Sequence, residues 1–453
     1  MSRLPRHRSP HSDPSPPLSP LPPPLQLPQG IWKIMVPALL ISYLVLACLH
    51  AAWVPTGQTG YQNAPDEAAH VSYVRTLTSG KLPTQGQADK DPVGQSYEWH
   101  QPPLYYAWTA IFTPLGARGM RLASIILGFA CLIVIYQAAM LLFPDSPFVV
   151  VVATGFAALL PTHIAITSTV NNDVLTELVF STVLLLLLQC FLRGLTLWRA
   201  GCIGFILGAA LLTKATAVLL IPIIVIGLVL MYFAGEQAAK IIKGTGILVG
   251  WALLLSGWWF VRNEHLYGEL LPLKAFSRAF DGTALAQPFI ERSGIANYIQ
   301  LVSQWTFQSF WAVFSNSTSA SPSLGRGLPL FLPDHIYLLP LMITVLAVAG
   351  FVRLTILRFK MGNERLTEFQ RLGLFLLLVT LSLVAVSFAA FLAKYFQTQG
   401  RYFFPAMLPI SILVSVGWLS LFPLKYRSLA AGIMLGTLAL LALLFLTSVQ
   451  AAT

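Results

Sequence analysis

Acidic side chains beside the apolar runs of this sequence are the groups best suited to chemistry. Asp66, Glu67 and His70 lie within five residues of one another, and Asp173 directly precedes a later apolar run. Asp66 and His70 are four residues apart, so a helix would place both on one face. A carboxylate placed there can accept the proton of an attacking hydroxyl. Acidic residues in a first helical turn also offset the helix dipole, and that structural interpretation stays open for Asp66 and Glu67.

Basic side chains lie at the ends of other apolar runs, at Lys214, Arg262 and Arg401. Such cations can neutralise a phosphate that leaves during a reaction. Each also has a structural alternative, because a long basic side chain can carry its charge to the membrane surface. Glu177 lies one turn after Asp173 in apolar surroundings, where an ionisable group is costly unless it is paired or faces water.

The aromatic segment 99–108 contains His100 and Tyr105. It is too short and too rich in proline for a membrane span, so we expect an interfacial or partly inserted segment. His100 could be a ligand, a hydrogen-bond donor or a solvated group. Glu67, His70 and His100 could together hold a divalent metal, but no pair has a diagnostic metal-binding spacing. The sequence therefore requires no cofactor and leaves a metal open.

The composition indicates which elements must position these residues. Of 453 residues, 56% are hydrophobic and 10% are charged, and the mean hydropathy is +0.71. Soluble domains carry about a quarter charged residues. These values exclude a soluble globular enzyme, a disordered protein and a disulfide-stapled secreted domain, and they predict an all-α polytopic membrane protein. The net charge of +11 indicates orientation in a membrane rather than a nucleic-acid partner.

We expect about eleven transmembrane helices, each with ends uncertain by about two to four residues. The fifth apolar run is short for a hydrocarbon layer of about 30 Å and could form one broken helix with the sixth. The runs cover residues 31–53, 119–142, 147–163, 174–192, 201–213, 216–233, 245–261, 336–352, 372–393, 402–422 and 428–447.

The charge distribution predicts the topology of a single transmembrane domain over residues 31–450. Residues 1–30 hold ten of the 31 prolines and predict a disordered cytoplasmic tail. With that tail inside, 15 of the 28 Lys and Arg residues fall on the cytoplasmic side, as the positive-inside rule favours. Two long loops, at about residues 54–118 and 262–333, then lie outside and carry interfacial helices. The second loop is expected to cover the site.

Seven short segments, taken in order over roughly residues 30–425, resemble the glycosyltransferase-C superfamily, whose members are membrane enzymes that use polyprenyl-phosphate sugars. The nearest branches are the protein O-mannosyltransferase and aminoarabinose transferase relatives, including an uncharacterised bacterial branch. The segments are 65–70 (Pro-Asp-Glu-Ala-Ala-His), 100–106 (His-Gln-Pro-Pro-Leu-Tyr-Tyr), 121–124 (Arg-Leu-Ala-Ser), 172–173 (Asn-Asp), 208–214 (Gly-Ala-Ala-Leu-Leu-Thr-Lys), 258–263 (Trp-Trp-Phe-Val-Arg-Asn) and 400–402 (Gly-Arg-Tyr).

This resemblance implies that Asp66 is the general base and that Asp173 assists it. It implies a polyprenyl-phosphate sugar donor and an acceptor that is a glycan, a lipid or a protein. The other partners are membrane lipids, with no nucleic acid. It implies a multi-pass protein of a bacterial plasma membrane, with its site facing outside. The substrate-binding residues would be Glu67, His70, His100, Tyr105, Lys214, Arg262 and Arg401.

Two other functions remain open from the sequence. A transporter or flippase of lipid-linked sugars is favoured by the short fifth run with Lys214 beside it, although charges near the bilayer midplane and inverted repeats would be expected. A non-catalytic membrane subunit would leave Asp66 and Asp173 far apart.

Overall fold

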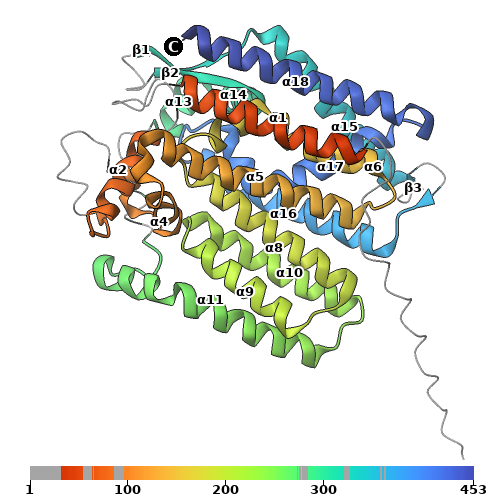
Figure 1. The fold of residues 1–453 in the computed structure, drawn as a ribbon, viewed down its shortest axis with the longest axis horizontal. Helices are drawn as coiled ribbons and strands as arrows, with labels where there is room; N and C mark the ends of the chain where they lie inside the picture. Colours follow the sequence, from red (N-terminus) through yellow and green to blue (C-terminus); the bar gives the residue numbers. More distant parts are fainter. Residues whose placement is uncertain are drawn as a thin grey trace, which may run out of the picture.

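The computed structural model shows a bundle of long helices that run roughly side by side (Figure 1). It describes residues 32–54, 64, 66–85, 96–272, 274, 277, 284–320, 327–357, 360–361 and 364–452. The predicted tail of residues 1–30 lies outside the described residues. The prediction of a helical, polytopic membrane protein is confirmed.

Within the described residues, nine helices are long and apolar enough to cross a membrane. Several include a short 3-10 turn at one end, as at η3 (Ala215–Leu219) and η5 (Gly400–Ala406). The main helices of these nine are α1 (Trp32–Trp53), α5 (Gly116–Leu142), α8 (Asp173–Arg193), α10 (Leu220–Phe233), α11 (Ala238–Tyr267), α15 (Leu338–Ile356), α16 (Glu368–Leu392), α17 (Met407–Ser420) and α18 (Arg427–Ala452).

The predicted count of eleven crossings is not confirmed, although all eleven predicted runs are helical. The run 147–163 forms α6 (Pro147–Leu159) and α7 (Pro161–Thr167), which are bent by 60° at a break. Pro161 explains the break, because the residue before a proline disfavours helical dihedrals, and Leu160 has extended ones. The fifth run forms α9 (Leu197–Leu211), whose 15 residues rise only about 22 Å. The sixth run can cross a membrane without α9, because residues 215–233 alone are long and apolar enough for a span.

Both predicted outer loops carry short helices. The first holds α2 (Glu67–Thr78), η1 (Tyr97–His100), α4 (Leu104–Ala110) and η2 (Thr113–Leu115). The second holds α13 (Ala286–Ser293), α14 (Ile295–Trp311) and the antiparallel strands β1 (Val313–Ala320) and β2 (Gly327–Phe331). The remaining elements are η4 (Asp334–Tyr337), η6 (Leu424–Tyr426) and the two-residue strands β3 (Lys360–Met361) and β4 (Glu364–Arg365).

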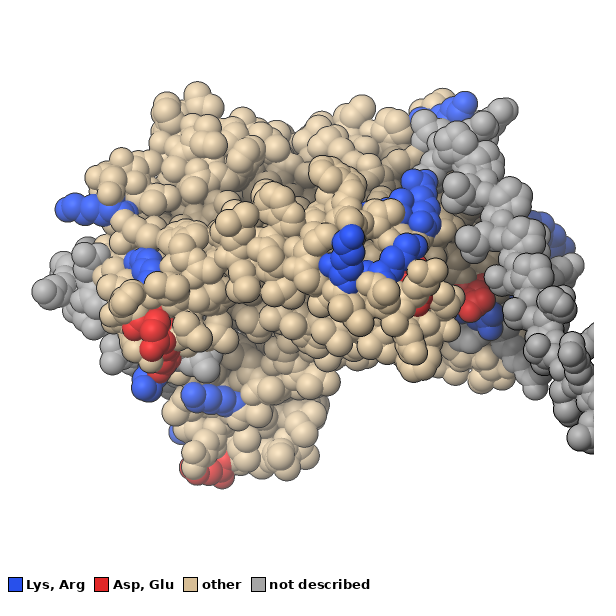
Figure 2. All heavy atoms as spheres, turned by 90° about the horizontal axis from the view of Figure 1, so that it is seen from below, with Lys and Arg blue, Asp and Glu red and all other residues tan. Residues whose placement is uncertain are grey.

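The charged side chains gather at the two ends of the bundle, and a broad band of uncharged side chains separates them (Figure 2). At the end where α1, α11 and α16 begin, their first turns and the last turns of α8 and α15 carry basic residues. All of these residues fall on the predicted cytoplasmic side. α2, α4 and the start of α8 lie at the opposite end (Figure 1).

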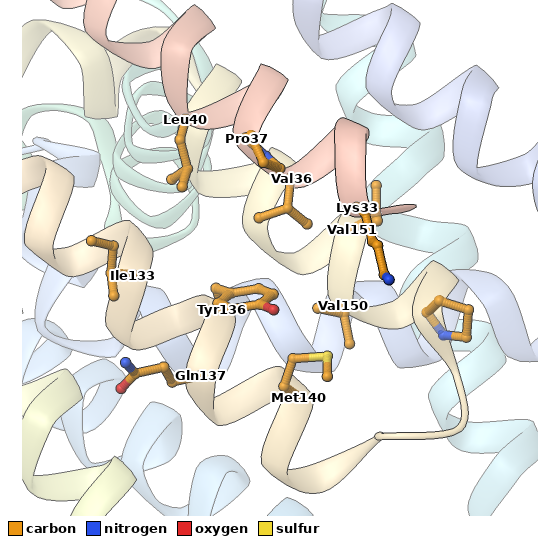
Figure 3. A pocket seen from close by; sticks show the side chains of 11 residues that line it. Lys33, Val36, Pro37, Leu40, Ile133, Tyr136, Gln137, Met140, Val150 and Val151 are labelled. Atoms are coloured by element: carbon orange, nitrogen blue, oxygen red, sulfur yellow. The ribbon is translucent and has the colours of Figure 1, made fainter. Parts of the chain in front are cut away.

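A cavity of about 260 Å³ lies between α1, α5 and α6. Its walls are mostly apolar, and Lys33 and Tyr136 are among the few polar side chains that line it (Figure 3). Because Lys33 belongs to the first turn of α1, this cavity lies at the basic end of the bundle, away from the residues of the candidate site.

Candidate active site

Asp66 sits at the corner that begins α2. Its φ of 64° makes it the only non-glycine residue with a positive φ among the described residues. The Asp66 carbonyl accepts hydrogen bonds from the N–H groups of Ala69 and His70, while its side chain makes no cap to the helix. The carboxylate instead accepts a hydrogen bond from the Tyr97 hydroxyl at 2.7 Å. Left-handed dihedrals outside glycine are uncommon, and such strain often accompanies functional corners.

Arg401 joins the two carboxylates that the sequence singled out. One guanidinium nitrogen forms an ion pair with Asp66, and another lies 3.4 Å from an oxygen of Asp173. The third guanidinium N–H donates to the Gln399 side-chain oxygen at 2.6 Å. Asp66 and Asp173 therefore face the same planar cation, although one starts a loop helix and the other a membrane helix.

Lys214 completes this group by forming an ion pair with the second oxygen of Asp173. The backbone that carries Asp173 is fixed locally, because the Asn171 side-chain oxygen accepts a hydrogen bond from the Asp173 N–H at 2.8 Å. Two carboxylates and two cations thus meet at one end of the bundle. We refer to Asp66, Asp173, Lys214 and Arg401 as the four-charge cluster.

Arg401 is held in place from the second outer loop. It is the second residue of η5, and the N–H of Gly400 donates to the Ser309 hydroxyl of α14 at 2.8 Å. A Cβ on Gly400 would lie 2.3 Å from the backbone nitrogen of Phe310, so only glycine allows this approach. The C-terminal turn of α14 therefore supports the residue that bridges the carboxylates, while a covering role for the whole loop stays a prediction.

The two histidines lie in buried surroundings close to the cluster. His70 Nδ1 is 2.9 Å from the Tyr106 hydroxyl, and His100 Nδ1 is 2.8 Å from the Tyr97 carbonyl. Burial lowers the pKa of His70, although the carboxylates of Glu98 and Asp66 act in the opposite direction. Burial also lowers the pKa of His100, to about 4. Both imidazoles are therefore neutral at physiological pH.

Tyr105 supports the backbone beside the cluster. Its hydroxyl lies 2.7 Å from the Ser124 hydroxyl and accepts a hydrogen bond from the Asn171 N–H at 2.8 Å. The ring is fully buried. The structure thus places Tyr105 behind Asn171, where it helps to hold the corner before Asp173.

Glu67 has a different place from its neighbour Asp66. Its carboxylate accepts hydrogen bonds from Arg121 Nε at 2.8 Å and from the Val170 N–H at 3.0 Å. The Arg121 guanidinium is fully buried and also donates to the carbonyls of Ala51 and Val54. This ion pair ties α2 to α1 and α5, so Glu67 is more than an exposed first-turn charge. Its oxygens have partners within the protein.

Arg262 lies outside the four-charge cluster. One of its guanidinium nitrogens donates to the Pro83 carbonyl at 2.7 Å, and the group stacks over the Trp259 ring at 4.6 Å. These contacts join α11 to the chain that follows α2. The structure brings Lys214 and Arg401 to the candidate catalytic carboxylates, and it brings Arg262 to the neighbouring backbone.

Two residues of the site were missed from the sequence. Tyr97 donates to Asp66, and Glu98 accepts from the Gln101 side-chain nitrogen at 3.0 Å. Both directly precede the aromatic segment 99–108, so extending that segment by two residues would have included them. Their contacts depend on η1 folding back onto α2, which no local spacing encodes.

The charges of the cluster determine the ionisation of Asp66. Burial alone would raise the pKa of Asp66, but the Arg401 guanidinium and the Tyr97 hydroxyl outweigh it and hold this pKa well below the usual range. Asp66 is therefore ionised at physiological pH. With Arg401 in contact, it is also a weak base, because an ion pair favours the charged form.

The option of a divalent metal, left open by the sequence, stays a prediction. No cluster of three or more His, Cys, Asp or Glu side chains suited to a metal occurs in the described part of the chain. The Asp66 and Asp173 oxygens that a cation would bind already face Arg401 and Lys214.

A largely apolar cavity of about 430 Å³ lies near the cluster, between α6, α14, α15, α16 and α17. Phe388 and Phe403 are among the side chains that line it. Phe403 is two residues from Arg401, and the Phe388 ring packs against Tyr402 with centroids 5.4 Å apart. The cavity therefore borders η5, the element that carries Arg401.

Comparison with known proteins gives a family match over part of the chain and a similar fold. Residues 100–259 match the family described as dolichyl-phosphate-mannose-protein mannosyltransferase. No curated protein matches the chain by sequence. The oligosaccharyltransferase of Archaeoglobus fulgidus has a similar fold in two crystal structures. The one in complex with Zn and sulfate has a TM-score of 0.53 and 13% identity over 90% of this chain and 52% of its own.

The other, tethered to an acceptor peptide, has a TM-score of 0.52 and 12% identity over 91% of this chain and 55% of its own. ArnT from Cupriavidus metallidurans bound to undecaprenyl phosphate has a TM-score of 0.46 and 16% identity over 85% of this chain and 59% of its own. This chain therefore spans just over half the length of these proteins. The family match and the fold confirm the predicted resemblance to the glycosyltransferase-C superfamily.

Proposed function

We propose that this chain, a membrane protein of the glycosyltransferase-C superfamily, transfers a sugar from a polyprenyl-phosphate-linked donor to an acceptor hydroxyl. The observation that carries the proposal is the placement of Asp66 and Asp173 on either side of Arg401. Carboxylates can act on the proton of a hydroxyl, and cations can stabilise a departing phosphate. Both groups are needed for this reaction, and here they share one site.

In the proposed reaction, Asp66 accepts the proton of the acceptor hydroxyl. The hydroxyl oxygen attacks the anomeric carbon, and the bond between that carbon and the phosphate oxygen breaks. The electron pair of this bond leaves with the polyprenyl phosphate, whose charge Arg401 and Lys214 neutralise. Asp173 holds Lys214 and Arg401 beside the leaving group.

The donor phosphate and Asp66 compete for the same guanidinium. While Arg401 contacts Asp66, the carboxylate is a weak base. A phosphate offers Arg401 a bidentate partner of equal or greater charge, so donor binding draws the guanidinium away from Asp66. The pKa of Asp66 then rises toward the range in which a carboxylate accepts a proton. This competition predicts that the donor binds before the acceptor.

The apolar cavity beside Phe403 suits the isoprenoid chain of such a donor. Its walls are mainly aromatic and aliphatic, and one of them is formed by Phe403 of η5, the element that carries Arg401, so a donor bound there would hold its phosphate toward the cluster. The bound donor would then be oriented with its charged group toward Asp66.

The site is proposed to face outside a bacterial plasma membrane. The support is that the cluster lies at the end of the bundle opposite the basic first turns of α1 and α11. No nucleotide sugar is supplied outside a cell, so a lipid-linked donor is the chemically suitable one. The sugar is a hexose or a pentose, and the acceptor is a glycan, a lipid or a protein.

Arg401→Lys tests this function most directly. Lysine keeps the charge but cannot contact both carboxylates through a planar fork. We expect purified Arg401→Lys protein to transfer labelled sugar from a polyprenyl-phosphate donor at least about tenfold more slowly than wild type. Arg75→Lys is the matched control, because Arg75 is exposed on α2 at the same end. Equal rates for the two variants would contradict the proposal, and donor transport without transfer in wild type would favour the flippase.

A further inference from the structure

A buried histidine–glutamate pair lies inside the bundle and takes no part in the proposed reaction. His163 belongs to α7 and Glu177 to α8, and both side chains have 0% exposure. His163 Nε2 lies 3.0 and 3.1 Å from the two carboxylate oxygens of Glu177. His163 is therefore the partner that Glu177 needs in apolar surroundings.

The pair lies next to both halves of the four-charge cluster. Glu177 is four residues after Asp173 on α8, so the two carboxylates share a helix face. The His163 ring packs edge-on against Phe404, with ring centroids 5.6 Å apart. Phe404 and Arg401 are three residues apart in η5, and a 3-10 helix aligns such residues on one side. One hydrogen-bonded pair thus joins α8, which carries Asp173, to the ring that packs on η5, which carries Arg401.

The orientation of the imidazole depends mainly on Glu177. Among the described residues, His163 Nδ1 is buried without a hydrogen-bond partner. The other groups that face the ring are the Tyr43 ring, at a centroid distance of 6.1 Å, and Phe404. Tyr43 donates instead to the Thr167 hydroxyl at 2.9 Å, and Thr167 donates to the His163 carbonyl at 2.7 Å. Glu177 therefore fixes the angle at which the ring meets Phe404.

We propose that His163 and Glu177 form a positioning pair that sets α7, α8 and η5 relative to one another, so that Arg401 reaches Asp66 and Asp173 together. A buried pair of ionisable groups contributes little net stability, because the loss of hydration offsets the attraction of the two groups. Apolar residues of similar volume in both positions often preserve stability. They lack a directional bond, however, and so would leave the rotation of α7 against α8 less defined.

The test replaces both partners at once. In His163→Leu/Glu177→Leu, no buried charge is left without a partner, so we expect thermal unfolding in detergent within a few degrees of wild type. We expect faster hydrogen exchange over residues 168–173 and 400–404. The rate of sugar transfer should fall between about 10- and 100-fold, as expected for a site misplaced by about 1 Å. Thr380→Val is the control, because its buried hydroxyl bonds only to the Leu376 carbonyl of its own helix.

A conservative variant separates positioning from simple packing. In Glu177→Gln the amide oxygen can still accept a hydrogen bond from Nε2–H, so transfer should stay within about threefold of wild type. A stable double variant with wild-type exchange and wild-type rate would overturn the proposal. So would a Glu177→Gln rate that is at least about tenfold below that of wild type, and this second outcome does not depend on whether the double variant folds.

The kinetic readout rests on the proposed function, whereas the exchange readout does not. If wild type shows no transfer, the proposed function fails. The positioning pair is then judged by exchange over residues 168–173 and 400–404 alone, where unchanged protection in the double variant would refute it.

Discussion

Replacing Asp66 by asparagine should slow sugar transfer and tighten the binding of polyprenyl phosphate at the same time. Asparagine keeps the size of the side chain and can still accept a hydrogen bond from Tyr97, but it cannot take a proton. Loss of a general base costs about 10²- to 10⁴-fold in rate, which is about 3–5 kcal/mol of activation free energy. The removed charge also frees the Arg401 guanidinium from its ion pair.

The expected gain in affinity follows from Coulomb's law. Two unit charges about 6 Å apart at an effective dielectric constant of about 20 repel by roughly 3 kcal/mol. The Asp66 side chain is 21% exposed, so we discount this to about 1–2 kcal/mol, or roughly 5- to 30-fold tighter binding. Arg401 keeps its second carboxylate partner, Asp173, and therefore stays in the site.

The assay pairs transfer of labelled sugar with the affinity of purified protein for undecaprenyl phosphate. Asp145→Asn is the matched control, because Asp145 is exposed in the turn between α5 and α6, outside the cluster. Near-normal transfer by Asp66→Asn would refute the role of Asp66 as base. Weaker phosphate binding by the same variant would refute the competition for Arg401.

Four further outcomes are expected. Glu67→Gln should destabilise the protein by about 3–5 kcal/mol, measured by thermal unfolding, because it leaves the buried Arg121 charge without its partner; stability equal to wild type would contradict this. Gly400→Ala should lower the transfer rate by at least about tenfold, because a Cβ collides with the α14 backbone, and a wild-type rate would argue against support of η5 by α14. The free energy of unfolding should fall by about 1–2 kcal/mol from pH 7 to pH 5 through His100. The pKa of His100 is about 4 in the folded protein and near 6.5 in the unfolded chain, so unfolding takes up a proton in that window. His100→Gln should remove this part of the pH dependence, and an unchanged slope in that variant would contradict the assignment to His100. A cysteine placed within residues 353–371 should react only from the cytoplasmic side, and labelling from outside would reverse the topology.

The fold was predictable to the extent that it depends on local hydrophobicity. All eleven predicted runs form helices, because about 20 apolar residues can satisfy their backbone groups only within a helix in lipid. Hydrophobicity alone does not predict the break between α6 and α7, because both helices belong to one continuous apolar run. The residue that indicates the break is Pro161. Whether α9 crosses the membrane depends on its packing against α11, where a Cβ on Gly204 would lie 2.2 Å from the Leu248 carbonyl. The spacing of Gly204 and Gly208, which both face the α11 backbone, is the sequence signal of such a close contact between helices.

The sequence predicted which residues belong to the candidate site, but it did not predict which of them contact one another. The topology placed Asp66, Asp173, Lys214 and Arg401 at one boundary, and the structure brings all four together. The same argument included Arg262, which contacts Pro83 instead. A charge count assigns a residue to an end of the bundle, but the distance between two residues at that end depends on how the loops fold. For Arg401 that depends on Ser309, which lies 92 residues earlier in the sequence.

Asp66 and Glu67 show how one backbone angle divides two neighbouring acids between chemistry and structure. At a regular helix start both carboxylates would share the first turn, and both would act mainly on the helix dipole. The positive φ of Asp66 turns its side chain toward Arg401 and Tyr97, while Glu67 enters the helix and points toward Arg121. The ion pair between Glu67 and Arg121 maintains the strained dihedrals of Asp66, because it anchors the first turn of α2 to α1 and α5. The position of the carboxylate proposed as the base therefore depends on the burial of the other.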